Sequence, residues 1–410
     1  MFDNILNQSA TTLLTDDILN NRLPNSILFS GPESSGKLSC ALETARILSC
    51  KEKGEWTCKC SSCLQHKAMV SQNLLIMGSS SRTLEIDAAR STLLRQSSQN
   101  SRHLEAAVYL YIRAVRKLTV RFSPILWEGD KELAKFSPLL EIIDDGLELI
   151  QPGRLLPEDA DLKKIVDDIG DACKKLENSY LYDSIPVSQI RKFSAWAHLA
   201  SSSGKKVLII EHAEFMAESS RNALLKILEE PPEDVVFILT TDRRGAILPT
   251  ILSRVRTYNF FERSNEQQQN LISRIFHHNP LFNEENKFNT INEFLQSYLP
   301  VKPSVVYQYS SQFYKSVSEG HVPPVADIVA GCSNFTPRVL YKIFLQGIIT
   351  EQKKLISTQA GCESSKKILE VLYKSYENVS VFYQNPYAAL EELTRSLMQI
   401  NYLNGGILKQ

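Results

Sequence analysis

The sequence has neither an excess of charge of one sign nor a long hydrophobic run. Its 46 Lys and Arg residues balance its 46 Asp and Glu residues, so the formal net charge is zero. A protein that binds nucleic acid alone usually carries a basic surplus, because contacts to phosphates supply most of the affinity. No apolar stretch reaches the roughly 18 residues of a membrane span, and the first residues show neither the basic nor the apolar region of a signal peptide. We therefore expect a cytoplasmic protein without membrane partners, and the charge balance disfavours a nucleic-acid binder that acts alone.

Internal repeats are also missing, and the fold has to be inferred from hydrophobic patterning. Short apolar segments at 26–30, 74–77, 207–210 and 235–240 predict buried strands, and helical periodicity at 11–21 and 38–50 predicts helices near them. Strands that alternate with helices favour a parallel sheet covered on both faces. The sequence therefore predicts an α/β fold.

The interval from about 92 to 183 contains no segment of comparable strand quality. Its apolar spacing predicts helices at 104–122, 131–149 and 159–180, which we interpret as an inserted helical module. After residue 260 the chain is again mostly helical, with predicted helices at 339–355 and 367–381.

A phosphate-binding loop follows the first predicted strand. Gly31 to Leu38 fits the pattern G-x-x-x-x-G-K, in which backbone N–H groups and a helix N-terminus hold an anion. Candidate nucleotide ligands in this loop are Gly31, Ser35, Gly36 and Lys37. The eighth position should offer a hydroxyl to Mg²⁺, which Leu38 lacks. Ser39 comes one residue later and should point elsewhere, because each helical residue turns by about 100°.

The strand at 207–210 ends in Glu211 and His212, where a P-loop ATPase usually has an Asp for Mg²⁺ and then a Glu for the attacking water. Glu211 could replace the Asp, while His212 brings no fixed negative charge. We favour a loop histidine without a role over a catalytic base. Together with Leu38, these departures predict a site that no longer hydrolyses ATP, although nucleotide binding stays open.

Four of the eight cysteines crowd into a short segment, with the spacing C-x7-C-x-C-x2-C. Thiolates bind Zn²⁺ tetrahedrally, so Cys50, Cys58, Cys60 and Cys63 predict a structural zinc site. His66 is a possible substitute ligand, and four reduced thiols without metal are the alternative. We expect the other cysteines to be buried filler.

Several motifs together resemble one protein family. The segment Asn222-Ala-Leu-Leu-Lys-Ile-Leu-Glu-Glu-Pro-Pro232 resembles the N-A-L-L-K-x-L-E-E-P-P segment of bacterial clamp-loader AAA+ subunits of DNA polymerase III. Thr240-Thr-Asp242 and Ser253-Arg254 are similar to the sensor and serine-arginine motifs of that family. The resemblance covers 1–90 and 184–260 well, and the last 150 residues only by helical character.

The resemblance implies a function within a larger assembly. In that family five subunits form an open ring that loads the sliding clamp on primed DNA during replication. The gamma/tau subunits hydrolyse ATP, whereas the delta-prime subunit lacks a working site and offers an arginine to its neighbour. Arg254 matches that arginine finger, and Thr241 joins Glu211 as a candidate nucleotide contact. Val255 departs from the cysteine that usually follows the arginine.

The resemblance also leaves two subunit types open and implies a domain plan. Leu38 and His212 favour a delta-prime type, while Glu85-Ile-Asp-Ala-Ala89 resembles the gamma/tau sequence after the cysteine loop. The family carries a zinc module of four cysteines here, with one residue more between the second and third. We expect an AAA+ core at 1–260 with the cysteine module at 50–63, a helical lid at 261–325 and a helical collar at 326–410. The implied partners are gamma/tau and delta subunits, the sliding clamp and primed DNA, and ATP and Mg²⁺ stay open as cofactors.

Overall fold

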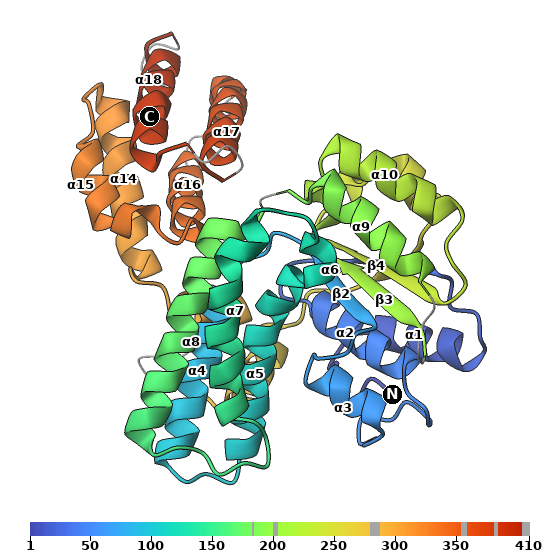
Figure 1. Ribbon diagram of the computed structural model, residues 1–410. Helices are drawn as coiled ribbons and strands as arrows, with labels where there is room; N and C mark the ends of the chain where they lie inside the picture. Colours follow the sequence, from blue (N-terminus) through green and yellow to red (C-terminus); the bar gives the residue numbers. More distant parts are fainter. Residues whose placement is uncertain (183, 200–203, 279–287, 354–358, 381–383, 404–410) are drawn as a thin grey trace. The chain divides into compact units, whose positions relative to one another are not determined.

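The computed structural model describes residues 1–182, 184–199, 204–278, 288–353, 359–380 and 384–403 (Figure 1). The chain divides into two compact units, Met1–Phe294 and Leu295–Gln410. This division falls inside the segment 261–325 that we expected to be a lid. In the described parts of the chain, no helix is long and apolar enough to span a bilayer.

A five-stranded parallel sheet forms the centre of the first unit. Its strands are β1 (Ser26–Ser30), β2 (Leu74–Met77), β3 (Lys206–Ile210), β4 (Val235–Thr241) and β5 (Arg256–Asn259). They lie in the order β2-β3-β4-β1-β5, and every neighbouring pair is parallel. Because all strands run the same way, the residues that follow β1, β3 and β4 meet at one edge of the sheet.

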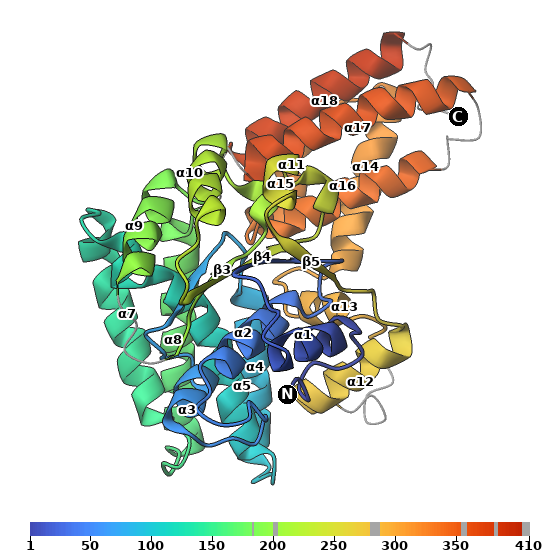
Figure 2. The same cartoon turned by 90° about the vertical axis from the view of Figure 1, so that its right-hand side faces the viewer.

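Both faces of the sheet are buried, which explains why the strands read as continuous apolar runs. Alternate residues of one strand enter different cores: Leu28 packs with one, while Ile27 and Phe29 pack with the other. Helices α1 (Ala10–Leu19) and α2 (Lys37–Leu48) cover the second face, and Figure 2 shows both on that side. The predicted α/β fold and its four strands are confirmed.

Longer helices cover the other face and continue into a bundle. The remaining helices of the first unit are α3 (Ser61–Lys67), α4 (Thr83–Ser98), α5 (Leu104–Thr119), α6 (Pro124–Trp127), α7 (Glu132–Leu149), α8 (Asp159–Tyr180), α9 (Val187–His198), α10 (Glu218–Glu229), α11 (Pro249–Leu252) and α12 (Asn265–Phe276). Helix α13 (Ile291–Gln296) spans the division between the units.

The helices predicted within 92–183 are confirmed, with α7 and α8 within one residue of their expected bounds. In Figure 1 α5 and α8 lie beside α4, and α7 packs on α8. This segment shares one hydrophobic core with the sheet, since Tyr111, Phe136 and Val166 cluster with Leu75 and Leu208. The segment is therefore a continuation of the sheet's own core.

The sequence pattern missed β5. This strand lies at the edge of the sheet, and only Tyr258 of its four residues is buried. Tyr258 donates a hydrogen bond of 2.6 Å to buried Asp17, and Arg256 pairs with the same carboxylate at 2.7 Å. A strand with one inward residue leaves too little hydrophobic signal to detect.

The second unit is helical. Its helices are α14 (Pro303–Glu319), α15 (Val325–Gly331), α16 (Val339–Gln352), α17 (Gln359–Ser380) and α18 (Pro386–Leu403). Aromatic side chains hold its centre, where Phe313, Phe335 and Tyr341 pack around Phe344. The helix predicted at 339–355 begins at Val339 as expected and ends at Gln352, while 354 and 355 lie outside the described residues. The helix predicted at 367–381 begins earlier, at Gln359, and residue 381 also lies outside the described residues.

Candidate nucleotide site and cysteine cluster

The phosphate loop joins β1 to α2, and two glycines allow its path. A Cβ on Gly31 would lie 2.3 Å from the carbonyl oxygen of Phe260, so only glycine fits there. Gly36 has φ of 94°, which favours glycine, and it precedes the first residue of α2. The strand, loop and helix N-terminus of a phosphate site are therefore all in place.

Lys37, which the sequence predicts to bind phosphate, is buried and points back into the protein. Its ammonium lies 2.8 Å from Oδ1 of Asp242 and donates to the carbonyl of Gly31 at 2.7 Å. It also donates to the carbonyl of Pro32 at 2.5 Å and approaches Oγ of Ser35 at 3.3 Å. Asp242 thus supplies to this lysine the negative charge that a phosphate would supply.

Glu211 follows β3 and is buried, with only 4% of its surface exposed. Its two carboxylate oxygens each pair with a guanidinium, one from Arg82 and one from Arg121. Burial would raise the pKa of this carboxyl, but the two arginines outweigh burial and lower the pKa to about 2. A role with Mg²⁺ would require one of these ion pairs to open.

Arg82 and Arg121 were not expected from the sequence. Arg82 precedes α4, and Arg121 lies in the short turn after α5. Glu177 of α8 fixes the same region, because its carboxylate accepts from the backbone N–H of Arg82 at 2.7 Å. These residues lie 90 to 129 positions from their partners along the chain, so no local pattern in the sequence connects them.

His212 has a left-handed backbone with φ of 48° and is half-buried. Its Nδ1 lies 3.5 Å from a carboxylate oxygen of Glu214 and 3.5 Å from one of Asp242. Burial lowers the pKa of His212, but the nearby carboxylates of Glu214 and Asp242 outweigh burial and raise the pKa. The imidazole is therefore held by two carboxylates at the edge of the sheet.

Leu38 and Thr241 both face the protein's interior. Leu38 packs against the core around α1 and α2, which explains an apolar residue at a position that usually carries a hydroxyl. Thr241 is fully buried at the end of β4, and its hydroxyl accepts from the N–H of Arg243 at 3.0 Å. Neither side chain offers an exposed group to a nucleotide in this conformation.

Arg254 lies on the surface just after α11. One of its Nη atoms pairs with Glu229 at 2.7 Å, and the other donates to the carbonyl of Thr250 at 2.8 Å. Glu229 is itself exposed, and ion pairs of this kind contribute little to stability. The guanidinium can therefore leave Glu229 for a stronger anionic partner at little cost.

The sulfurs of the four clustered cysteines lie close together near the N-terminus of α3. One sulfur from each of Cys50, Cys58, Cys60 and Cys63 lies within 4.8 Å of the other three. This spread suits a tetrahedral metal, whose sulfur ligands lie about 2.3 Å from the ion. The shortened C-x-C spacing therefore does not prevent the four sulfurs from meeting.

The surroundings of the cluster favour a thiolate at Cys60, whereas burial raises the pKa of Cys63. Burial opposes ionisation of Cys60, but N–H groups of Lys51 and Cys63 point at its sulfur and lower its pKa to about 6. The buried guanidinium of Arg46 donates to the sulfur of Cys63 at 3.0 Å. Positive partners of this kind offset the charge of a four-thiolate zinc centre, so the residues present fit Zn²⁺.

His66 is buried near this cluster but lies outside the set of four sulfurs. Burial and the nearby Arg46 and Arg113 lower its pKa to about 4, so the imidazole is neutral. The four cysteines complete a tetrahedral set without it.

Comparison with known proteins identifies the family. A family model described as "DNA polymerase III, delta subunit" matches residues 6–121 and 158–264, more than half of the chain. The chain belongs to this family. Its P-loop, its sheet order and its helical second unit agree with the AAA+ fold expected from the sequence.

Curated relatives come from two subunit types of the family. The DNA polymerase III subunit delta' of Haemophilus influenzae is 40% identical over 76 residues, which are 18% of this chain and 23% of the relative. The delta' subunit of Bacillus subtilis is 35% identical over 98 residues, 22% of this chain and 30% of the relative. The gamma/tau subunit of Mycobacterium bovis is 40% identical over 70 residues, 17% of this chain and 12% of the relative. The chain thus matches less than a third of the length of each of these relatives.

Among solved structures, a DNA polymerase III gamma subunit-related protein of Thermotoga maritima aligns with 53% of this chain and 80% of its own. The sequence identity is 19% and the TM-score is 0.27. The fold assignment therefore depends on the strand order and the family match.

The family match also covers part of the interval 92–183. It includes α4, α5 and α8 and passes over 122–157, which holds α6 and α7. The family model thus matches 92–121 and 158–183 within the interval that we interpreted as inserted.

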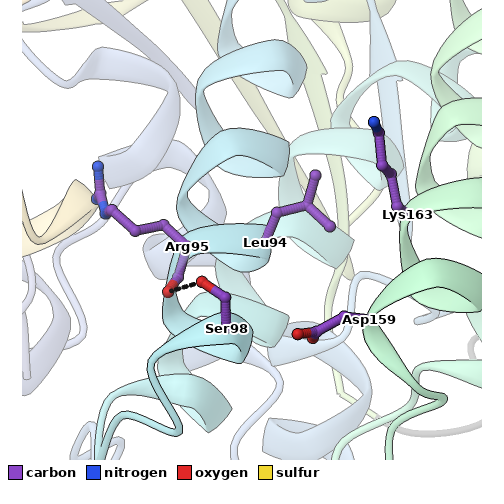
Figure 3. A pocket seen from close by; sticks show the side chains of 5 residues that line it. All are labelled: Leu94, Arg95, Ser98, Asp159 and Lys163. Carbon is purple, nitrogen blue, oxygen red and sulfur yellow. Dashed lines mark hydrogen bonds between the residues drawn. The ribbon is translucent and has the colours of Figure 1, made fainter.

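A hollow of about 400 Å³ opens where the end of α4 meets the start of α8, and Figure 3 shows the side chains around it: Leu94, Arg95, Ser98, Asp159 and Lys163. Arg95 extends away from the hollow and donates to the carbonyl of Phe276 at 2.7 Å. Ser98 donates to the carbonyl of Arg95 within α4. Arg95 and Ser98 thus donate to backbone carbonyls at the ends of helices, and we assign no ligand to the hollow.

The cysteine cluster gives a first testable prediction. Purified protein should contain one zinc per chain at the four cysteines, and Cys58→Ser should lower the zinc content, because three ligands hold the ion less tightly than four. Elemental analysis measures this. As a matched control, Cys332→Ser removes a buried cysteine outside the cluster and should leave the zinc content unchanged. Less than about a tenth of an equivalent of zinc at the cysteines would contradict the structural site.

Proposed function

We propose that the chain is a delta-prime-type subunit of the DNA polymerase III clamp loader. Its family, its delta' relatives and its altered nucleotide site support this proposal. The observation that carries it is the internal pairing of both charged groups of the site. Lys37 is engaged by Asp242, and Glu211 is engaged by two arginines. A site in this state, without a hydroxyl at Leu38, cannot assemble Mg²⁺ and phosphate for hydrolysis.

In the proposed assembly the chain contributes Arg254 to a neighbouring ATPase subunit. A guanidinium beside a γ-phosphate stabilises the charge that spreads over it in the transition state. The exposed position of Arg254 and its pairing with an exposed carboxylate support a role toward another molecule. The neighbour would be of the gamma/tau type, and the ring would also hold a delta subunit and load the sliding clamp on primed DNA in the cytoplasm.

The absence of hydrolysis gives a second prediction. The purified chain with ATP and Mg²⁺ should turn over ATP no faster than its own Lys37→Ala variant, because the wild-type site already lacks working parts. A coupled phosphate-release assay measures both proteins side by side. ATP turnover that is present in the wild type and absent in Lys37→Ala would instead support the alternative, a gamma/tau-type motor. The similarity to gamma/tau relatives is the reason for this alternative.

We propose further that the helical second unit is the collar through which the ring assembles. A chain that ends at Phe294 keeps the whole first unit and loses the second. This truncated chain should keep its far-ultraviolet circular dichroism per residue but fail to join gamma/tau and delta subunits in a complex. Size-exclusion chromatography with light scattering measures the assembly. A ring that forms with the truncated chain would contradict the collar role.

A further inference from the structure

Three side chains with metal-ligating atoms converge beside the phosphate loop. His212 and Glu214 lie in the segment after β3, and Asp242 follows β4. One ligand atom from each lies within 4.8 Å of the other two. We propose that these three residues bind a divalent transition metal, of which zinc is the best fit, at a second site distinct from the cysteine cluster.

The distances between the ligand atoms agree with a metal at their centre. Nδ1 of His212 lies 3.5 Å from Oε1 of Glu214 and 3.5 Å from Oδ2 of Asp242. Both distances are long for direct hydrogen bonds. Zinc takes nitrogen and oxygen ligands at about 2.0–2.2 Å, so two ligands of a tetrahedral ion lie about 3.4 Å apart. The imidazole and the two carboxylates are spaced as such ligands are.

Unsatisfied polar atoms give a second and independent indication. The side chain of Glu214 is 1% exposed, and its Oε2 has no hydrogen-bond partner among the described residues. Nδ1 of His212 also lacks a hydrogen-bond partner within the part of the chain that the structure describes. A buried carboxylate oxygen without a partner is costly, and a cation bound by both oxygens of Glu214 would remove that cost.

The backbone and Lys37 hold the three ligands in place. The N–H of Asp242 donates to Oε1 of Glu214 at 3.1 Å, which ties the ends of β3 and β4 together. Lys37 pairs with Oδ1 of Asp242, so Oδ2 stays available to a metal. The carboxylate of Asp242 can therefore bridge the ammonium and the ion. A mixture of one imidazole and two carboxylates suits zinc better than Mg²⁺, which prefers oxygen ligands.

The test compares metal content at equilibrium. Full-length wild type and the variants His212→Asn and Asp242→Asn are dialysed against micromolar Zn²⁺ without nucleotide, and bound zinc per chain is measured by elemental analysis. Asparagine tolerates the left-handed backbone of residue 212, so this variant should fold. The matched control is His321→Asn, because His321 also lies 3.6 Å from a carboxylate but is exposed and belongs to no such triad.

Each variant at the site should bind one equivalent of zinc less than wild type, while His321→Asn should bind as much as wild type. This difference does not depend on whether the cysteine cluster is filled or on whether the clamp-loader proposal holds. Equal zinc content in wild type and both site variants would overturn the proposal. If one site variant loses its far-ultraviolet circular dichroism, the comparison uses the other site variant. Wild type that binds no zinc beyond the cysteine site would also overturn the proposal.

Discussion

Replacing Arg254 by alanine should lower ATP hydrolysis at the neighbouring site by about a thousand-fold or more, which is the usual effect of losing an arginine finger. The residue lies on the surface of this chain, so its loss should not disturb the fold. Because several sites of the proposed ring would hydrolyse ATP, the measurement needs a complex in which only the adjacent ATPase subunit has an intact phosphate loop. Single-turnover hydrolysis in that complex then reports on the one site.

Two further variants make the result specific. Arg244→Ala removes another exposed arginine of the same edge and should leave hydrolysis unchanged. Arg254→Lys should behave almost like alanine, because lysine lacks the planar fork of donors that a guanidinium offers to phosphate oxygens. Unchanged hydrolysis in the Arg254→Ala complex would contradict the trans role and favour a different arginine.

Replacing Arg121 by methionine should destabilise the first unit by about 3 kcal/mol, because it leaves the buried carboxylate of Glu211 with one partner where it had two. Urea denaturation followed by circular dichroism measures the loss. Arg116→Met is the matched control, and Arg116 lies in the last turn of α5, shortly before Arg121. Arg116 pairs with exposed Asp144, so its loss should cost less than about 1 kcal/mol. Equal costs for the two variants would contradict a strong buried network around Glu211.

The same ion pairs predict the direction of acid sensitivity. The pKa of Glu211 is held near 2, below its ordinary value of 4.5. The stabilisation from Glu211 is therefore complete above about pH 4.5 and is lost as the pH falls toward 2. The Arg121→Met variant should lose less stability over this interval than the wild type does.

The sequence predicted those parts of the fold that depend on local pattern. The strands at 26–30 and 74–77 have the expected bounds, because each is a short apolar run buried on both faces. The helix at 159–180 also has its expected bounds, since an apolar stripe along its length packs on α4 and α7. The edge strand β5 was missed because it buries a single side chain.

The candidate site was predictable only in part. The phosphate loop and the cysteine cluster are each patterns within a short stretch of sequence. In the structure the residues of the loop lie together, and so do the four cysteine sulfurs. The partners that decide their chemistry come from distant segments: Asp242 for Lys37, and Arg82 and Arg121 for Glu211. Buried ion pairs between such segments follow from the tertiary fold and leave no periodic signal.

The strand order has a consequence for how the chain folds during synthesis. The central strand β1 has β4 and β5 as its neighbours, and Ser26 pairs with Phe237. About 200 residues thus separate the two sides of the sheet's central ladder, and closing so long a loop costs conformational entropy before any contact compensates it. On the ribosome, the helical pairs α4–α5 and α7–α8 can form early from local contacts. The phosphate loop, by contrast, can be flanked by both neighbouring strands, β4 and β5, only after the segment that ends in Asn259 has emerged from the exit tunnel.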